Sequence, residues 1–110
     1  MFKQLSIMIA TGLISSGAMA ADVWHTSTIK TIYPNGNGSW IITLDSDSSS
    51  CGNTENPKRY AVATSQNGVT DDGNKKMYAA ALMAKAMEST VTIIFSDSTT
   101  DCLINRLIVQ

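Results

Sequence analysis

The sequence predicts a mainly β domain with one helix, a small OB-like Greek-key barrel in the order β-β-β-α-β-β with one disulfide. Five short segments are rich in β-branched and aromatic residues, and polar turn segments separate them. One longer segment of strong helix formers lies between the third and the fourth of these strands. This order of elements is typical of the five-stranded OB barrel. An open α+β sandwich is the alternative architecture for the same order.

The first two strands are expected to form a hairpin. Residues 23–33 contain alternating strand-forming side chains, and residues 39–45 resume the pattern. Between them, residues 34–38 are Pro-Asn-Gly-Asn-Gly, and Asn and Gly tolerate the positive φ that tight turns need. Alternation predicts the following shared faces: Ile29, Thr31 and Tyr33 in the first strand, and Trp40, Ile42 and Leu44 in the second.

A polar loop and three further strands are expected in the rest of the chain. The loop is residues 46–57, and the strands are residues 59–64, 90–96 and 102–109. In the last strand, alternation places Ile104 on the same face as Arg106 and Ile108.

The only predicted helix covers residues 72–88, where alanine, leucine and methionine are frequent. Thr70 and the acidic residues that follow it offer oxygens for the N-cap. The spacing i, i+3, i+4, i+7 predicts a core-facing stripe of Ala79, Leu82, Met83 and Ala86. Other apolar residues lie elsewhere around the helix. A second packing surface between subunits explains this pattern, and so does the tolerance of alanine for either environment.

Residues 1–20 have the pattern of a cleavable secretory signal peptide. Lys3 supplies the positive charge, residues 5–15 are an uncharged apolar run, and small residues precede the expected cleavage point after Ala20. The apolar run is too short to cross a hydrocarbon core about 30 Å thick, which disfavours a membrane anchor. We therefore expect a single OB-like domain over residues 21–110 that is secreted or periplasmic after cleavage and has no membrane span.

Cys51 and Cys102 are the only cysteines, and both lie in the predicted mature domain. Export to an oxidising compartment favours a disulfide between them. Closing a loop of this length is expected to stabilise the fold by roughly 4 kcal/mol. A metal site or a catalytic thiol is the alternative, but the sequence offers no further ligands or base in a suitable pattern.

Composition and motifs disfavour nucleic-acid binding, catalysis and a bound cofactor. The chain carries nine acidic and eight basic residues with no basic stripe, which is unlike a nucleic-acid-binding surface. His25 is the single histidine, so neither a histidine metal cluster nor a Cys-His catalytic pair is expected. Two pairs of acidic residues, at 45 and 47 and at 71 and 72, could serve acid-base catalysis only if one member had a raised pKa. Both pairs fall in predicted loops or caps, where solvation opposes such a rise. We expect no enzyme activity, no metal and no cofactor.

The aromatic residues suggest a different function, because sugar sites often combine an aromatic face with hydroxyls and amides. Trp24, Tyr33, Trp40 and Tyr60 all lie on predicted strands. Trp40 and Tyr60 are interpreted as core residues, whereas Trp24 lies too near the mature N-terminus for a core position to be expected. The candidate ligand-binding residues are Trp24, His25, Thr26 and Ser27.

Residues 71–94, an amphipathic helix followed by a Thr/Val/Ile strand, and the hairpin in residues 26–44 carry a resemblance to known proteins. Together with the signal peptide, the element order and the disulfide, they resemble the B subunits of AB5 toxins of the subtilase-cytotoxin and typhoid-toxin type. The resemblance implies a homopentamer of OB-fold subunits whose helices line a central pore. It also implies binding of host-cell-surface glycans, often sialylated, and an enzymatic A subunit as partner.

In that family a serine after an aromatic pair on the first strand contacts the sugar, and the matching candidates here are Thr26 and Ser27. Three departures bear on this match: the longer N-terminal lead is missing, there is one disulfide where relatives often have two, and His25 interrupts the aromatic pair. The alternative function is a small secreted or periplasmic module that binds or inhibits another protein and has no lectin activity.

Overall fold

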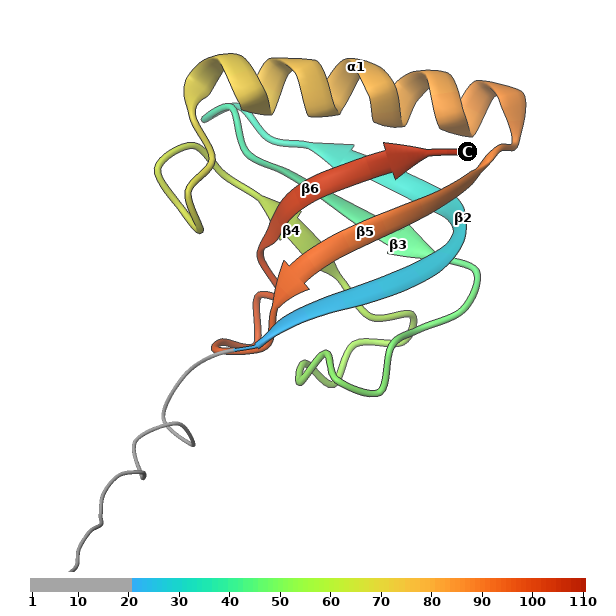
Figure 1. The fold of residues 1–110 in the computed structure, drawn as a ribbon, viewed down its shortest axis with the longest axis vertical. Coiled ribbons are helices and arrows are strands. Elements are labelled where there is room, and N and C mark those ends of the chain that lie inside the picture. Colours follow the sequence, from blue (N-terminus) through green and yellow to red (C-terminus); the bar gives the residue numbers. More distant parts are fainter. Residues whose placement is uncertain (1–20) are drawn as a thin grey trace, which may run out of the picture.

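The computed structural model describes residues 21–110, so the predicted signal peptide at residues 1–20 lies outside the described residues. A bent antiparallel sheet has one helix lying across one of its ends (Figure 1). The elements are β2 (Asp22–Pro34), β3 (Trp40–Leu44), β4 (Tyr60–Val62), α1 (Asp71–Met87), β5 (Thr90–Ser96) and β6 (Ile104–Val109). The predicted order of strands and helix is confirmed, and most boundaries agree within a residue or two.

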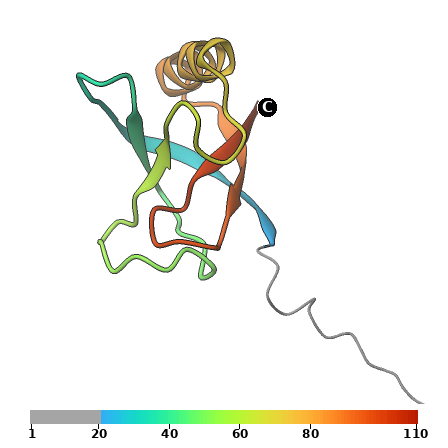
Figure 2. The same ribbon diagram turned by 90° about the vertical axis from the view of Figure 1, so that its left-hand side faces the viewer.

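The five strands form one antiparallel sheet in the order β4-β3-β2-β5-β6. The long strand β2 curves through its centre (Figure 2), so that its first half pairs with β5 and its second half with β3. Within residues 21–110 the edge strands β4 and β6 share no ladder. One backbone hydrogen bond of 3.2 Å, from the Ala61 N–H to the Asp101 carbonyl, joins β4 to the segment before β6. The sheet is therefore not closed, and the prediction is confirmed as a mainly β domain with one helix.

The core lies on the inner face of this curved sheet. Trp40 and Tyr60 are almost completely buried, as interpreted from the sequence. The Tyr60 ring meets Phe95 edge-on with centroids 5.4 Å apart, and Trp40 meets Tyr78 of α1 in the same way at 5.3 Å. Such edge-to-face pairs stabilise by roughly 0.5–1.5 kcal/mol beyond the area they bury, so the two pairs help to fix β4 on β5 and α1 on β3.

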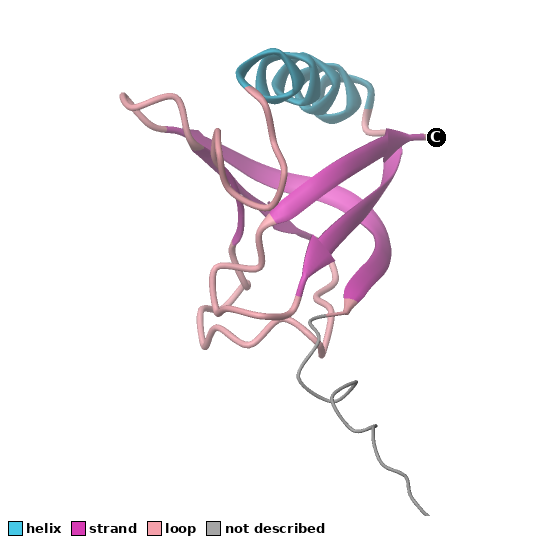
Figure 3. Ribbon diagram, turned by 60° about the vertical axis from the view of Figure 1, so that its left-hand side comes forward, coloured by secondary structure: helices cyan, strands magenta, loops and turns pink. Residues whose placement is uncertain are grey.

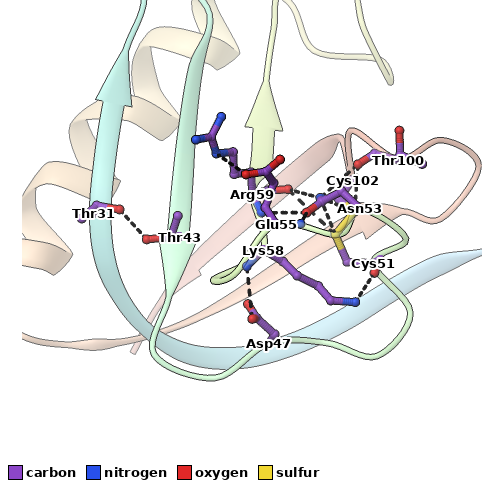
Figure 4. Close-up of polar contacts among 10 residues, drawn as sticks. All are labelled: Thr31, Thr43, Asp47, Cys51, Asn53, Glu55, Lys58, Arg59, Thr100 and Cys102. Carbon is purple, nitrogen blue, oxygen red and sulfur yellow. Dashed lines mark hydrogen bonds and ion pairs between the residues drawn. A yellow bond between two sulfur atoms is a disulfide. The ribbon is translucent and has the colours of Figure 1, made fainter.

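A register shift in β2 makes the predicted face of this strand wrong. Ile29 pairs with Leu44, but Thr31 pairs with Thr43, the residue before Leu44, so one residue of β2 has no partner in the ladder. A bulge of this kind reverses the side-chain alternation beyond it. Ile29 and Ile32 therefore both face the core, whereas Thr31 hydrogen-bonds through its hydroxyl to that of Thr43 (Figure 4).

A second bulge, between β5 and β6, changes the position of Ile104. Ile94 pairs with Arg106, whereas Phe95, the next residue of β5, pairs with Ile104. Alternation predicted that Ile104 shares a face with Arg106, and this is wrong. Ile104 is 1% exposed in the core, and Arg106 is exposed to solvent.

Helix α1 begins and ends at well-formed caps. The Thr70 side chain accepts a hydrogen bond of 3.0 Å from the Gly73 N–H, so the predicted N-cap is confirmed. At the other end Glu88 adopts a left-handed conformation with φ 56°, and the Ser89 N–H donates to the Ala84 carbonyl at 2.9 Å. This arrangement satisfies carbonyls that the last helical turn leaves free.

The side of α1 that faces the core differs from the prediction. The predicted stripe of Ala79, Leu82, Met83 and Ala86 is exposed. The buried residues are instead Asn74, Ala81 and Ala84, with Met77 and Tyr78 partly buried beside them. Small alanine side chains let the helix approach β2 and β6 closely, and the Asn74 amide is tolerated because it is fully hydrogen-bonded.

The predicted disulfide between Cys51 and Cys102 is formed, with a Cα–Cα distance of 5.6 Å. It joins the loop after β3 to the segment before β6, at the end of the sheet away from α1 (Figure 3). Beside it, the Asn53 amide donates to the Arg59 carbonyl at 2.8 Å and the Thr100 carbonyl at 3.0 Å (Figure 4). The disulfide and Asn53 therefore hold together the two edges of the sheet, near β4 and β6, where no ladder of backbone hydrogen bonds joins them.

Candidate functional site

The four residues predicted to bind a ligand, Trp24, His25, Thr26 and Ser27, are consecutive on β2. Successive side chains of a strand point to opposite faces, so the four residues cannot form one site. Trp24 and Thr26 are exposed on one face of β2, and His25 and Ser27 are partly buried on the other. The structure therefore brings these residues together only as two separate pairs.

His25 and Ser27 both contact Ser46, in the loop that follows β3. The His25 Nε2 lies 2.8 Å from the Ser46 carbonyl oxygen, a contact that requires the ring proton to be on Nε2. The Ser46 N–H donates to the Ser27 Oγ at 3.0 Å. These two side chains thus tie the loop to β2.

Trp24 and Thr26 lie on the outer face of the sheet, on a surface that spans three strands; Trp24, Thr26 and Arg106 are exposed there, whereas Thr92 and Ile94 are buried. The register aligns Trp24 with Ile94 and Arg106 in one row, and it aligns Thr26 with Thr92 and Ile108 in the next. We call this surface the Trp24 face, defined by Trp24, Thr26, Thr92, Ile94, Arg106 and Ile108.

The Trp24 face combines an aromatic surface, hydroxyls and a positive charge. Trp24 is 62% exposed, which is unusual for so large an apolar side chain. The Thr26 and Thr92 hydroxyls lie 2.8 Å apart and hydrogen-bond to each other; Thr92 is buried, so the accessible hydroxyl for a ligand is that of Thr26. Arg106 adds a guanidinium from the same row, and its backbone lies about 10 Å from that of Trp24, which is two strand spacings.

The acidic side chains after β3 make structural contacts. Asp47 accepts a hydrogen bond of 3.1 Å from the Lys58 N–H (Figure 4), and the Tyr60 hydroxyl lies 3.3 Å from its other oxygen. Burial raises the pKa of Tyr60 to about 12, and the nearby Asp47 charge adds to this rise. The Ser48 N–H donates to the same Tyr60 oxygen at 2.9 Å and acts in the opposite direction. Tyr60 is therefore a neutral, buried anchor for this loop at ordinary pH.

Within residues 21–110, no three His, Cys, Asp or Glu side chains gather in a way that would hold a metal ion. In the same range, no helix has the length and the apolar content needed to cross a membrane.

Two cavities lie away from the Trp24 face. One of about 240 Å³ is formed by the turn between β2 and β3 and by the first half of α1, and Trp40 and Tyr78 line it. The other, of about 380 Å³, lies at the C-terminal end of α1 beside Lys30 and Lys85. The sequence does not predict the first cavity, because its pattern indicates only a core position for Trp40. The spacing of Asn74 and Tyr78, one helical turn apart and in line with Ala81, was the available signal.

No protein-family model matches the chain, and no curated protein matches it.

Proposed function

We propose that the chain is a secreted glycan-binding subunit that assembles as a ring and resembles the B subunit of an AB5 toxin. In this proposal residues 1–20 direct export, and the Trp24 face binds a carbohydrate of the host-cell surface. An enzymatic A subunit is the expected partner of the ring. The exposed Trp24 side chain beside the paired threonine hydroxyls is the single observation that carries the proposal.

The chemistry of the Trp24 face suits a sugar ring. An indole offers an apolar surface for the C–H face of a pyranose, while the exposed Thr26 hydroxyl, which is hydrogen-bonded to the buried Thr92, exchanges hydrogen bonds with the sugar hydroxyls. Arg106 favours an acidic sugar, because a guanidinium forms two parallel hydrogen bonds with a carboxylate. A sialylated glycan is therefore the proposed ligand, in agreement with the resemblance.

The arrangement of strands supports an OB-type barrel as the fold behind this function. In that architecture a long, curved first strand pairs with both the second and the fourth strands. Here β2 pairs with β3 through one half and with β5 through the other. The Ala61–Asp101 hydrogen bond lies where the edges of such a barrel meet.

The exposed stripe of α1 supports assembly into a homopentamer. Leu82 is 46% exposed, Met83 58% and Met87 66%, and all three lie on the helix side turned away from the core. A cluster of large exposed apolar side chains on a small domain commonly marks a protein interface. Packing of this stripe between subunits would cover it, as the pore-lining helices do in the family that the sequence resembles.

The glycan-binding role is tested by a glycan array with the exported protein and its Trp24→Ala variant. We expect the wild-type protein to bind sialylated glycans and the variant to lose most of the signal. Tyr33→Ala is the matched control, because Tyr33 is also an exposed aromatic residue of β2 but lies outside the Trp24 face. Equal binding by wild type and Trp24→Ala, or no binding by the wild type, would refute the proposed role.

Native mass spectrometry tests the assembly. The homopentamer is expected for the wild-type protein, and Met83→Lys is expected to dissociate it because the lysine charge would be buried between subunits. A monomer for the wild type would refute the ring. The exposed apolar stripe would then favour the second function, a module that binds or inhibits another protein.

A further inference from the structure

The cavity of about 240 Å³ between the β2–β3 turn and α1 has the construction of a small binding site. Segments from distant parts of the sequence form it, because the turn at residues 34–39 lies beside the first half of the helix (Figure 1). Pockets for drug-sized ligands measure roughly 300–1,000 Å³, so this volume suits a single ring.

Trp40 forms the floor of the cavity, and a buried hydrogen-bond network fixes its position. The Trp40 Nε1–H donates to the Asn74 Oδ1 at 2.6 Å. The Asn74 amide nitrogen then donates to the Gly38 carbonyl at 3.0 Å and to the Thr64 hydroxyl at 3.1 Å. One buried amide thus fixes the floor, the turn and the helix in a single arrangement before any ligand arrives, which lowers the entropic cost of binding.

The walls are apolar and the rim is polar. Pro34 and Tyr78 line the cavity beside the Trp40 floor. At the rim, Asp71 and Lys75 form an ion pair of 3.3 Å whose side chains are mostly exposed. Ring surfaces below and hydrogen-bonding groups above are the two features that a pyranose requires, since its C–H face is apolar and its edge carries hydroxyls.

We propose that this cavity binds one terminal pyranose of a saccharide, at a site separate from the Trp24 face. The choice of a saccharide rests on the proposed function, whereas the site itself rests on the cavity. An apolar side chain of a partner protein would also fit the Trp40 floor. Such a side chain would, however, form no hydrogen bonds with Asp71 and Lys75, whereas the hydroxyls of a sugar would pair with both. The charged rim therefore favours the sugar.

Trp40 provides a direct readout of this site. The chain has two tryptophans, so Trp24→Phe leaves Trp40 as the only indole and perturbs the Trp24 face at the same time. We would titrate this variant with the methyl glycosides of hexoses, N-acetylhexosamines and N-acetylneuraminic acid and follow its emission. A saturable change with at least one of these sugars is expected, because the ligand would lie against Trp40.

The helix offers a matched control for the rim. Asp71 and Lys75 line the cavity, whereas Asp72 and Lys76 form the same type of i,i+4 ion pair, at 3.1 Å, one residue further along and away from it. Loss of a charged hydrogen-bond partner should weaken binding by about tenfold or more. In the Trp24→Phe background, Asp71→Ala is therefore expected to weaken the titration by that factor, and Asp72→Ala to leave it unchanged.

Three results would overturn this inference. The first is no saturable change with any sugar of the panel, and the second is equal weakening by Asp71→Ala and Asp72→Ala. The third is a saturable change with the amide of an aromatic amino acid that Asp71→Ala does not affect, which would indicate a pocket for a protein side chain. The proposed function is tested separately, because array binding that depends on Trp24 would stand even if Trp40 gave no response.

Discussion

Removal of the Cys51–Cys102 disulfide is expected to lower the free energy of unfolding by about 4 kcal/mol. The cysteines are 51 positions apart in the sequence. Opening a loop of that length returns about 14 cal/mol/K of chain entropy to the unfolded state, which is about 4 kcal/mol at 25 °C. Small domains have a total stability of roughly 5–15 kcal/mol, so this loss would leave a marginal fold.

Equilibrium urea unfolding, followed by far-UV circular dichroism, measures this loss in the Cys51→Ala/Cys102→Ala variant. With an m value of about 1–2 kcal/mol/M, the midpoint should fall by about 2–4 M. Because both sulfurs are buried, the alanine variant also loses packing contacts. The wild-type protein with its disulfide reduced keeps both sulfur atoms, so it isolates the effect of the cross-link.

The reduced wild type should therefore lose about 4 kcal/mol, and the double variant somewhat more. A loss below about 1 kcal/mol in the reduced protein, with an unchanged m value, would refute the loop-closure reasoning. The Asn53 hydrogen bonds to Arg59 and Thr100 would then be sufficient to hold the two segments.

Three further predictions test the alkaline stability, the helix orientation and the second bulge. Because folding raises the pKa of Tyr60 from 10.0 to about 12, its contribution to stability is complete below pH 10 and is lost as the pH rises through 12. Ultraviolet titration of tyrosinate and urea unfolding at these pH values would check this, and ionisation of all tyrosines near pH 10 would contradict it. Ala84→Leu should destabilise by about 1–3 kcal/mol through overpacking, whereas Met83→Lys should change the stability of the monomer by less than about 0.5 kcal/mol. Thermal unfolding at dilutions at which the wild type is monomeric distinguishes the two variants. A larger loss for Met83→Lys than for Ala84→Leu would support the helix face predicted from the sequence. In urea unfolding, Ile104→Ala should lower the free energy of unfolding by about 2–5 kcal/mol, and Ile108→Ala by clearly less, because the bulge places only Ile104 in the core. Equal losses would contradict the bulge, since they would put both residues on one face.

The sequence predicted the elements well because their signals are local. The turn at residues 34–38, the N-cap at Thr70 and the alanine-rich helix each depend on residues close together in the chain, and all three occur where expected. The Cys51–Cys102 pairing was also predictable, since only two cysteines are present and the predicted signal peptide would send them to an oxidising compartment.

The face of an element was less predictable than its existence. On α1, the spacing of Ala79, Leu82, Met83 and Ala86 fits a core-facing stripe as well as the true one does, because apolar residues surround the helix. What decided the orientation was Asn74, whose amide meets the Trp40 indole, the Gly38 carbonyl and the Thr64 hydroxyl only when that side of the helix faces the sheet. No local pattern reveals partners so far away in the sequence.

The candidate site shows the same limit. The sequence drew attention to Trp24, and its high exposure agrees with a surface role. The prediction of one site from four consecutive strand residues is wrong, because alternation separates Trp24 and Thr26 from His25 and Ser27. Arg106 entered the Trp24 face only through the strand register.

The sequence by itself determined the order of strands and helix, the disulfide and the buried roles of Trp40 and Tyr60, because short-range patterns and composition encode them. Only the tertiary structure decided the Trp24 face, the inward position of Ile104 and the cavity lined by Trp40 and Tyr78. Each of these depends on how β2, β5, β6 and α1 are placed against one another, through bulges that shift register and a buried amide that fixes the helix. Such features are set by contacts between residues distant in the chain, which a pattern along the sequence does not contain.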